Sequence, residues 1–127
     1  MINPMDFLRS AKQYIGLSEV ANRNSASRAY YCMYHICLDI ALKNGFDKYK
    51  RKFRVRLNRS GFHGKLIMFY QYKKQKDIAK LLNRMRKIRV SADYYLDNEF
   101  SIEKAEEQLF NAQELLKKIE PLKSQSF

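Results

Sequence analysis

The stretch that decides the fold runs from residue 25 to residue 43 and is SASRAYYCMYHICLDIALK. Drawn as a helix, it places apolar or aromatic side chains nearly all round the axis, and it stops at Asn44-Gly45, a common signal at helix C-termini. A helix that is apolar nearly all round is typical of the centre of a bundle or of a dimer interface. This stretch therefore predicts a central helix.

Four further helices are predicted around it from apolar residues that recur every three or four positions. Only 4 Gly and 2 Pro occur among the 127 residues, which excludes a turn-rich β fold. We expect a turn or a helix restart at residues 21–25 and a single all-α domain over residues 1–127, with its core at about 5–120. The predicted helices run from Asn3-Pro4 to about Gly16, from Phe62 to about Tyr72, from Asp77 to Tyr95, and from the cap Ser101 to Pro121.

Residues 46–61 form a basic insertion whose structure the sequence leaves open. Phe53-Arg-Val-Arg-Leu alternates with a period of two, which favours a short extended piece or a basic loop. A helix dense in Lys and Arg is the alternative.

The net charge of +12 is concentrated in one part of the chain. Residues 43–89 contain 17 Lys and Arg against two Asp, while the remainder carries a net charge of −3. Such a one-sided field attracts polyanions, most often nucleic acid, although a basic surface that serves only solubility is the alternative. Tyr49 and Phe53 lie among these cations and could stack on unpaired RNA bases. The predicted RNA-binding residues are Lys48, Lys50, Arg51, Lys52, Arg54, Arg56, Arg59 and Arg86.

Several classes of protein are disfavoured by what the sequence lacks. Cys32 and Cys37 would lie about 140° apart around a helix, so they cannot bridge each other, and free thiols favour a reducing compartment. No signal peptide and no apolar run of 18 residues is recognisable, so we expect a cytoplasmic protein without a membrane span. With only two His and scattered carboxylates, we expect no metal site and no cofactor.

The central helix carries a polar stripe made of Arg28, His35 and Asp39. Arg28 and His35 lie about 10.5 Å apart along the axis, and Asp39 follows one turn later. A charged stripe on an apolar helix needs ionic partners or a wet cleft. One interpretation pairs Arg28 and Asp39 with other helices and makes His35 a neutral, hydrogen-bonded residue of the core. The other is a catalytic site, with His35 as general acid or base, Asp39 orienting its ring, and Arg28 binding phosphate.

Three segments in order resemble one branch of the HEPN superfamily of small helical nucleotide- and RNA-associated proteins. They are Ser27-Arg-Ala-Tyr-Tyr-Cys-Met-Tyr-His35, Gly61-Phe-His63-Gly, and Arg89-Val-Ser-Ala-Asp93-Tyr. The resemblance implies a four- to five-helix up-and-down bundle, often a homodimer, and it adds His63, Arg89 and Asp93 as further candidate catalytic residues. In HEPN ribonucleases the catalytic pattern is Arg, four to six residues, then His in a late helix. Here only Arg28 and His35 match that spacing, and they lie in the second helix.

The same resemblance suggests what the tyrosines do. Tyr30, Tyr31, Tyr34, Tyr94 and Tyr95 are expected mostly in the core at helical spacing. In HEPN proteins that a nucleotidyltransferase silences, a tyrosine near the site accepts the nucleotide, so Tyr94 and Tyr95 are modification candidates.

Three functions remain at this stage. The first is a HEPN-type RNA-binding protein that acts as a toxin-like, metal-independent endoribonuclease in a toxin–antitoxin or phage-defence system, with a cognate antitoxin as partner. The second is a non-catalytic partner subunit that binds nucleotide or a nucleotidyltransferase. The third is a structural oligomer whose charge is incidental.

Overall fold

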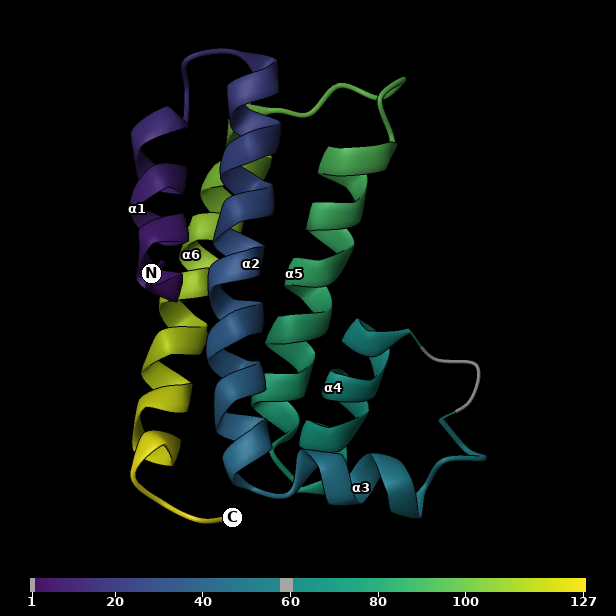
Figure 1. Ribbon diagram of the computed structural model, residues 1–127. Coiled ribbons are helices and arrows are strands. Elements are labelled where there is room, and N and C mark those ends of the chain that lie inside the picture. The colour runs from purple at the N-terminus through teal and green to yellow at the C-terminus, as the bar shows by residue number, and fades with distance from the viewer. Residues whose placement is uncertain (1, 58–60) are drawn as a thin grey trace.

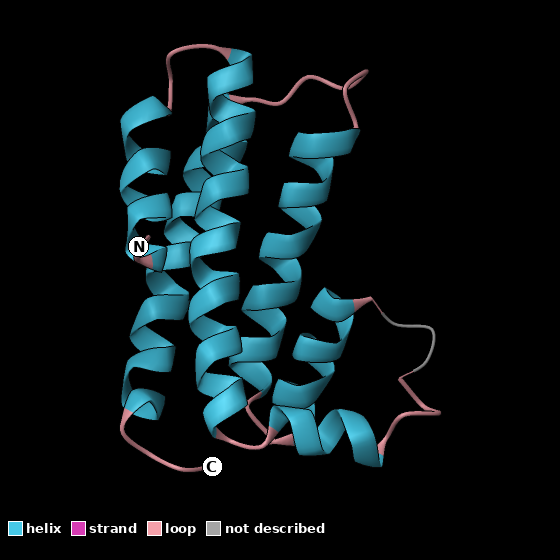
Figure 2. Cartoon of the chain, viewed as in Figure 1, coloured by secondary structure: helices cyan, strands magenta, loops and turns pink. Residues whose placement is uncertain are grey.

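The computed structural model describes residues 2–57 and 61–127, and within these ranges it is all-helical, with no strand (Figure 2). The all-α bundle expected from the sequence is confirmed. Long helices run up and down the molecule, and a short helix, α3, crosses its lower end (Figure 1). The elements are α1 (Pro4–Tyr14), α2 (Glu19–Lys43), α3 (Phe46–Lys52), α4 (Phe62–Tyr72), α5 (Lys76–Tyr94), α6 (Ile102–Ile119) and the 3-10 helix η1 (Glu120–Lys123).

Helix α2 is the central element of the bundle. It packs against α1, α5 and α6 along its length, and against α3 and α4 near its C-terminal end. Twelve of its residues are buried, among them Tyr30, Met33 and Cys37. The central position predicted from its all-round apolar surface is confirmed. Both cysteines are buried and free, as expected.

The start of α2 differs from the prediction. The helix begins at Glu19, where the hydroxyl of Ser18 accepts a hydrogen bond from the backbone N–H of Ala21. Residues 21–25, expected to form a turn or a helix restart, lie inside the first turns of this helix. Polar residues such as Asn22 and Arg23 looked like a turn in sequence, but both are buried.

Arg23 explains why this polar segment is helical. Its guanidinium donates to the backbone carbonyls of Ala92, Tyr95 and Asn98, and it pairs with Glu19 at 3.1 Å. Arg23 therefore donates hydrogen bonds to carbonyls at and just after the C-terminal end of α5, where helix carbonyls lack partners within the helix. These hydrogen bonds stabilise the buried charge of Arg23. A contact across about 70 residues of chain decides this local structure.

The basic insertion begins as a helix. Residues 46–52 form α3, and residues 53–57 continue as turns, so the extended piece suggested by the period of two is wrong. Phe46 and Tyr49 face the core beneath α4, while Lys48, Arg51 and Lys52 are exposed. The remaining predicted helices are confirmed, with bounds within about two residues of those expected.

Candidate functional site

Aromatic and charged side chains meet where α2, α4 and α5 pack together. Each of the three elements carries one of the three sequence segments quoted above, and His63 lies in the first turn of α4. These side chains are called the aromatic–cationic cluster below. It consists of Tyr30, Tyr31 and Tyr34 from α2, His63 from α4, and Arg89 and Asp93 from α5.

His63 is held by a hydrogen bond to the buried Tyr30. The hydroxyl oxygen lies 2.6 Å from Nδ1 of His63, and the Tyr34 ring packs 4.4 Å from the imidazole, centroid to centroid. Burial, followed by the fields of Arg89, Arg86 and His35, lowers the pKa of His63 below its ordinary value. Burial also raises the pKa of Tyr30, so its hydroxyl stays protonated. The pair is therefore a neutral imidazole beside a neutral phenol at neutral pH.

Arg89 is a buried cation enclosed by rings. Only 7% of the residue is exposed, and its guanidinium carbon lies 5.5–5.7 Å from the ring centroids of Tyr30, Tyr31 and Tyr94. Asp93 pairs with it at 3.6 Å and accepts a hydrogen bond from the hydroxyl of Ser27. The buried Nε of Arg89 has no hydrogen-bond partner among the described residues. Arg89 is thus a fixed positive charge with unused hydrogen-bonding capacity.

Two members of the predicted stripe on α2 have partners elsewhere. Arg28 donates to the hydroxyl of Ser10 at 2.6 Å and lies over the ring of Tyr14, both on α1. Asp39 is exposed and pairs with Lys43 one turn along the same helix, at 3.2 Å. Arg28 thus has the partner on another helix that the structural interpretation requires, whereas Asp39 pairs within its own helix.

His35, the third member, contacts the edge of the aromatic–cationic cluster. It is exposed and stacks on Phe7 of α1, with ring centroids 5.9 Å apart. Its ring also lies 5.3 Å from Tyr34 and 6.4 Å from Tyr31. Because His63 contacts the same two tyrosines, both histidines of the chain flank one aromatic pair.

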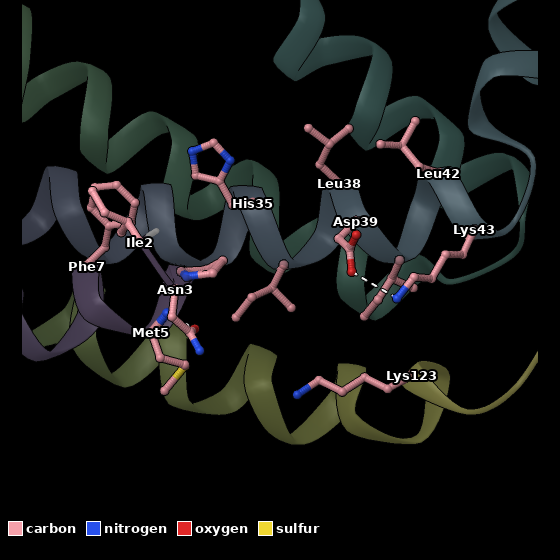
Figure 3. Close-up of a pocket in the computed structure, with 13 residues that line it drawn as sticks. Ile2, Asn3, Met5, Phe7, His35, Leu38, Asp39, Leu42, Lys43 and Lys123 are labelled. Carbon is pink, nitrogen blue, oxygen red and sulfur yellow. Dashed lines mark hydrogen bonds and ion pairs between the residues drawn. The ribbon is translucent and has the colours of Figure 1, made fainter.

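His35 and Asp39 also line a pocket. This hollow of about 890 Å³ lies between the start of α1, the C-terminal half of α2 and η1, and its walls are mostly apolar. Figure 3 shows the Asp39–Lys43 ion pair on α2 with Lys123 on the facing ribbon, and the His35 ring on the other side of the α2 ribbon. Neither Tyr30 nor His63 is among the residues that line this pocket.

The basic insertion adjoins the aromatic–cationic cluster through Lys50. The ammonium of Lys50 lies 4.7 Å from the ring centroid of Phe46 and 4.8 Å from that of Phe62, the residue before His63. Arg86 of α5 is half-buried and close enough to lower the pKa of His63. The predicted cation Arg59 lies outside the described residues. The exposed cations of the insertion are Lys48, Arg51, Lys52, Arg54 and Arg56.

The tyrosines divide into two groups. Tyr30 and Tyr34 are buried and Tyr31 is half-buried, as expected. Tyr94 and Tyr95 are 68% and 55% exposed, so their expected place in the core is wrong. They follow the buried Ala92 at the end of α5, where the helix leaves the bundle. Both hydroxyl-bearing rings are accessible, and Tyr94 also touches Arg89.

Sequence reasoning missed the contacts of Tyr30, Tyr31 and Ser27 with charged partners. The available signal was their spacing, since Ser27, Tyr30, Tyr31 and Tyr34 lie three or four residues apart and share one helical face. This face is apolar enough to predict a core position, but its polar partners lie on the neighbouring helices α4 and α5.

Comparisons of the chain with protein-family models, with curated proteins and with solved structures found no match. Within residues 2–57 and 61–127, no group of three or more His, Cys, Asp or Glu side chains is arranged to hold a metal ion. No helix in those ranges has the length and hydropathy needed to cross a membrane. Function is therefore inferred from the geometry of the side chains.

Proposed function

We propose that this protein binds single-stranded RNA and cleaves it without a metal ion at the aromatic–cationic cluster, as a toxin-like HEPN-type endoribonuclease of a toxin–antitoxin or phage-defence system. One observation carries the proposal: a partly buried histidine, held by Tyr30, lies in the combined field of Arg86 and Arg89. Such a concentration of positive charge at a proton-transfer group suits an anionic substrate.

The positive charge of the basic insertion would attract the phosphodiester backbone of RNA toward the cluster. The exposed cations of α3 and of residues 53–56 lie on the chain segment that leads into α4, and Lys50 contacts Phe62 beside His63. RNA bound along these cations would pass the first turn of α4. Arg86 and Arg89 are then placed to stabilise negative charge on the phosphate during the reaction.

Two imidazoles around Tyr31 and Tyr34 provide the proton transfers that RNA cleavage needs. The 2′-OH of the ribose attacks the adjacent phosphorus while neutral His63 takes its proton, and the P–O5′ bond breaks as His35, the general acid, gives a proton to the leaving 5′ oxygen. The products are a 2′,3′-cyclic phosphate and a 5′-OH. When the Nδ1–H of His63 donates a hydrogen bond to the hydroxyl oxygen of Tyr30, the lone pair of Nε2 is free to accept the proton.

The same contact supports a second function, that of a non-catalytic partner subunit. If the Tyr30 hydroxyl donates to Nδ1, the proton of neutral His63 sits on Nε2. His63 then offers a hydrogen bond to a phosphate but cannot accept a proton there. In this form the cluster binds RNA or nucleotide, and the exposed Tyr94 is available to a partner nucleotidyltransferase. A homodimer is compatible with both functions.

Cleavage of a labelled single-stranded RNA in EDTA tests the proposal. We expect wild-type protein to give products that end in 2′,3′-cyclic phosphate, and His63→Gln to reduce the rate by about 10²- to 10⁴-fold. Lys12→Gln, which removes an exposed charge on α1, is the matched control and should retain the wild-type rate. RNA binding without cleavage would reject the ribonuclease and favour the partner subunit. Absence of RNA binding at low salt would reject both.

A further inference from the structure

A smaller hollow lies between α3 and the C-terminal end of α4, away from the cluster. Its volume is about 270 Å³, close to the lower end of the roughly 300–1,000 Å³ range of small-ligand pockets. Aromatic rings form its floor and lysines surround it. The side chains that matter for its chemistry are Tyr49, Phe53, Tyr72, Lys48, Lys52 and Lys73.

Three of these rings contact one another. Tyr49 lies 5.1 Å from Phe53 and 5.0 Å from Tyr72, and Phe53 lies 5.2 Å from Tyr72, centroid to centroid. Tyr49 is buried and Phe53 half-buried, whereas Tyr72 is 46% exposed. The buried ring thus supports two others that present apolar surface to solvent.

The rim of the hollow is positively charged. Lys48 and Lys52 lie one helical turn apart on α3, and the ammonium of Lys52 is 5.4 Å from the Phe53 ring centroid. Lys73 is held at the rim by a hydrogen bond to the main-chain oxygen of Phe127, which uses one of the three N–H groups of Lys73. The described residues that line the hollow include no Asp or Glu.

We infer that this hollow binds one unpaired base of a single-stranded RNA, with the neighbouring phosphates on the lysines. Base–aromatic stacking tolerates any base because every base has a π-face, and cations beside the rings follow the backbone. A duplex cannot use such a site, because its bases are already stacked on one another. Three ammonium groups without a carboxylate favour a polyanion over a protein ligand.

The position of the hollow relative to His63 fits one continuous strand. Tyr72 and His63 are nine residues apart on α4, which is about 13 Å along the helix axis. A strand of a few nucleotides can therefore contact both ends of α4. The inference rests on the proposed RNA function, and it adds a base-holding site that is distinct from the site of cleavage.

The test uses the full chain and a single-stranded 2′-O-methyl RNA that contains 2-aminopurine, a fluorescent base that is quenched by stacking. We expect quenching when wild-type protein binds. Tyr72→Ala should weaken binding about 5-fold or more and abolish the quenching, because one stacked base is lost. Tyr72→Phe keeps the ring and should behave as wild type.

Lys48→Gln provides a variant whose folding is not in question, because Lys48 is exposed on α3. Lys48→Gln should weaken RNA binding and reduce the slope of log affinity against log salt by about 0.7. Lys12→Gln on α1 removes the same charge outside the hollow and should leave this slope unchanged. Wild-type binding that is unchanged in both Tyr72→Ala and Lys48→Gln would overturn this site and leave the RNA function standing. A wild type that binds no RNA at low salt would overturn both.

Discussion

The hydroxyl oxygen of Tyr30 lies 2.6 Å from Nδ1 of His63 and joins the central helix α2 to the first turn of α4. The same Tyr30 ring lies 5.6 Å from the guanidinium carbon of Arg89 on α5. One buried side chain therefore sets the positions of a histidine and an arginine that are 26 residues apart in sequence. The geometry of the candidate site depends on this one residue of the core.

Replacement of Tyr30 by Phe should destabilise the protein modestly. The ring and its packing are kept, but a hydrogen bond is lost, and half-buried His63 keeps partial access to water. We expect the free energy of unfolding to fall by about 1 kcal/mol, measured by urea denaturation. Tyr72→Phe is the matched control and should change it little, since Tyr72 is largely exposed. Equal stability of Tyr30→Phe and wild type would show that the bond contributes nothing.

Stability should depend on pH through His63. Its pKa in the folded state lies below the ordinary value of about 6.5, so between the two pKa values the unfolded chain binds the proton more readily. The stabilisation is complete above about pH 6.5 and is lost as the pH falls through the lower, folded-state pKa. We expect the melting temperature of wild type to fall between pH 7 and pH 5, and the fall to be smaller in His63→Gln. An identical fall in both proteins would contradict this account.

Arg89→Ala should be among the most damaging substitutions on α5. It removes the guanidinium that contacts three tyrosine rings and leaves Asp93, whose side chain is 30% exposed, without its cation. We expect a loss of about 2–3 kcal/mol by chemical denaturation. The matched control is Lys87→Ala, an exposed cation on the same helix, which should change stability by no more than about 0.5 kcal/mol. Similar losses in the two variants would show that burial of Arg89 is unimportant.

The exposed cations of the basic insertion should set the salt dependence of RNA binding. Replacement of Arg51, Arg54 and Arg56 by Gln should lower the slope of log affinity against log salt by about 2, because each phosphate contact contributes about 0.7 for a single strand. Removal of three cations outside the insertion, Arg9, Lys12 and Lys104, is the control of equal charge. Equal effects of the two triple variants would mean that RNA responds to net charge alone.

Most of the fold follows from local patterns in the sequence. The apolar surface of residues 25–43 predicted the central helix, and regular stripes predicted α4, α5 and α6. The beginning of α2 could not be predicted, because Arg23 is stabilised by carbonyls of α5 and of the loop after it. The insertion was ambiguous because alternating Arg and apolar residues at 53–57 mimic a strand, although the chain forms turns there.

The candidate site was only partly predictable for a related reason. Helical periodicity correctly placed Arg28, His35 and Asp39 along one helix, but it does not show which neighbouring helix each side chain meets. In the structure Arg28 contacts α1, while Tyr30 on the next face meets His63 and Arg89. Periodicity did not single out His63, Arg89 and Asp93, and the structure brings these three side chains to the tyrosines of α2.

The central claim, that RNA phosphate binds at the Tyr30–His63–Arg89 contact, is tested most directly by NMR of the histidine Cε1–H signals. The chain has only two His, so His35→Gln assigns both signals. On titration with a non-cleavable 2′-O-methyl single-stranded RNA, the His63 signal should shift saturably. Its pKa should also rise toward the ordinary value, because a bound phosphate favours the protonated ring. An RNA that binds while the signal and pKa of His63 stay unchanged would contradict the account.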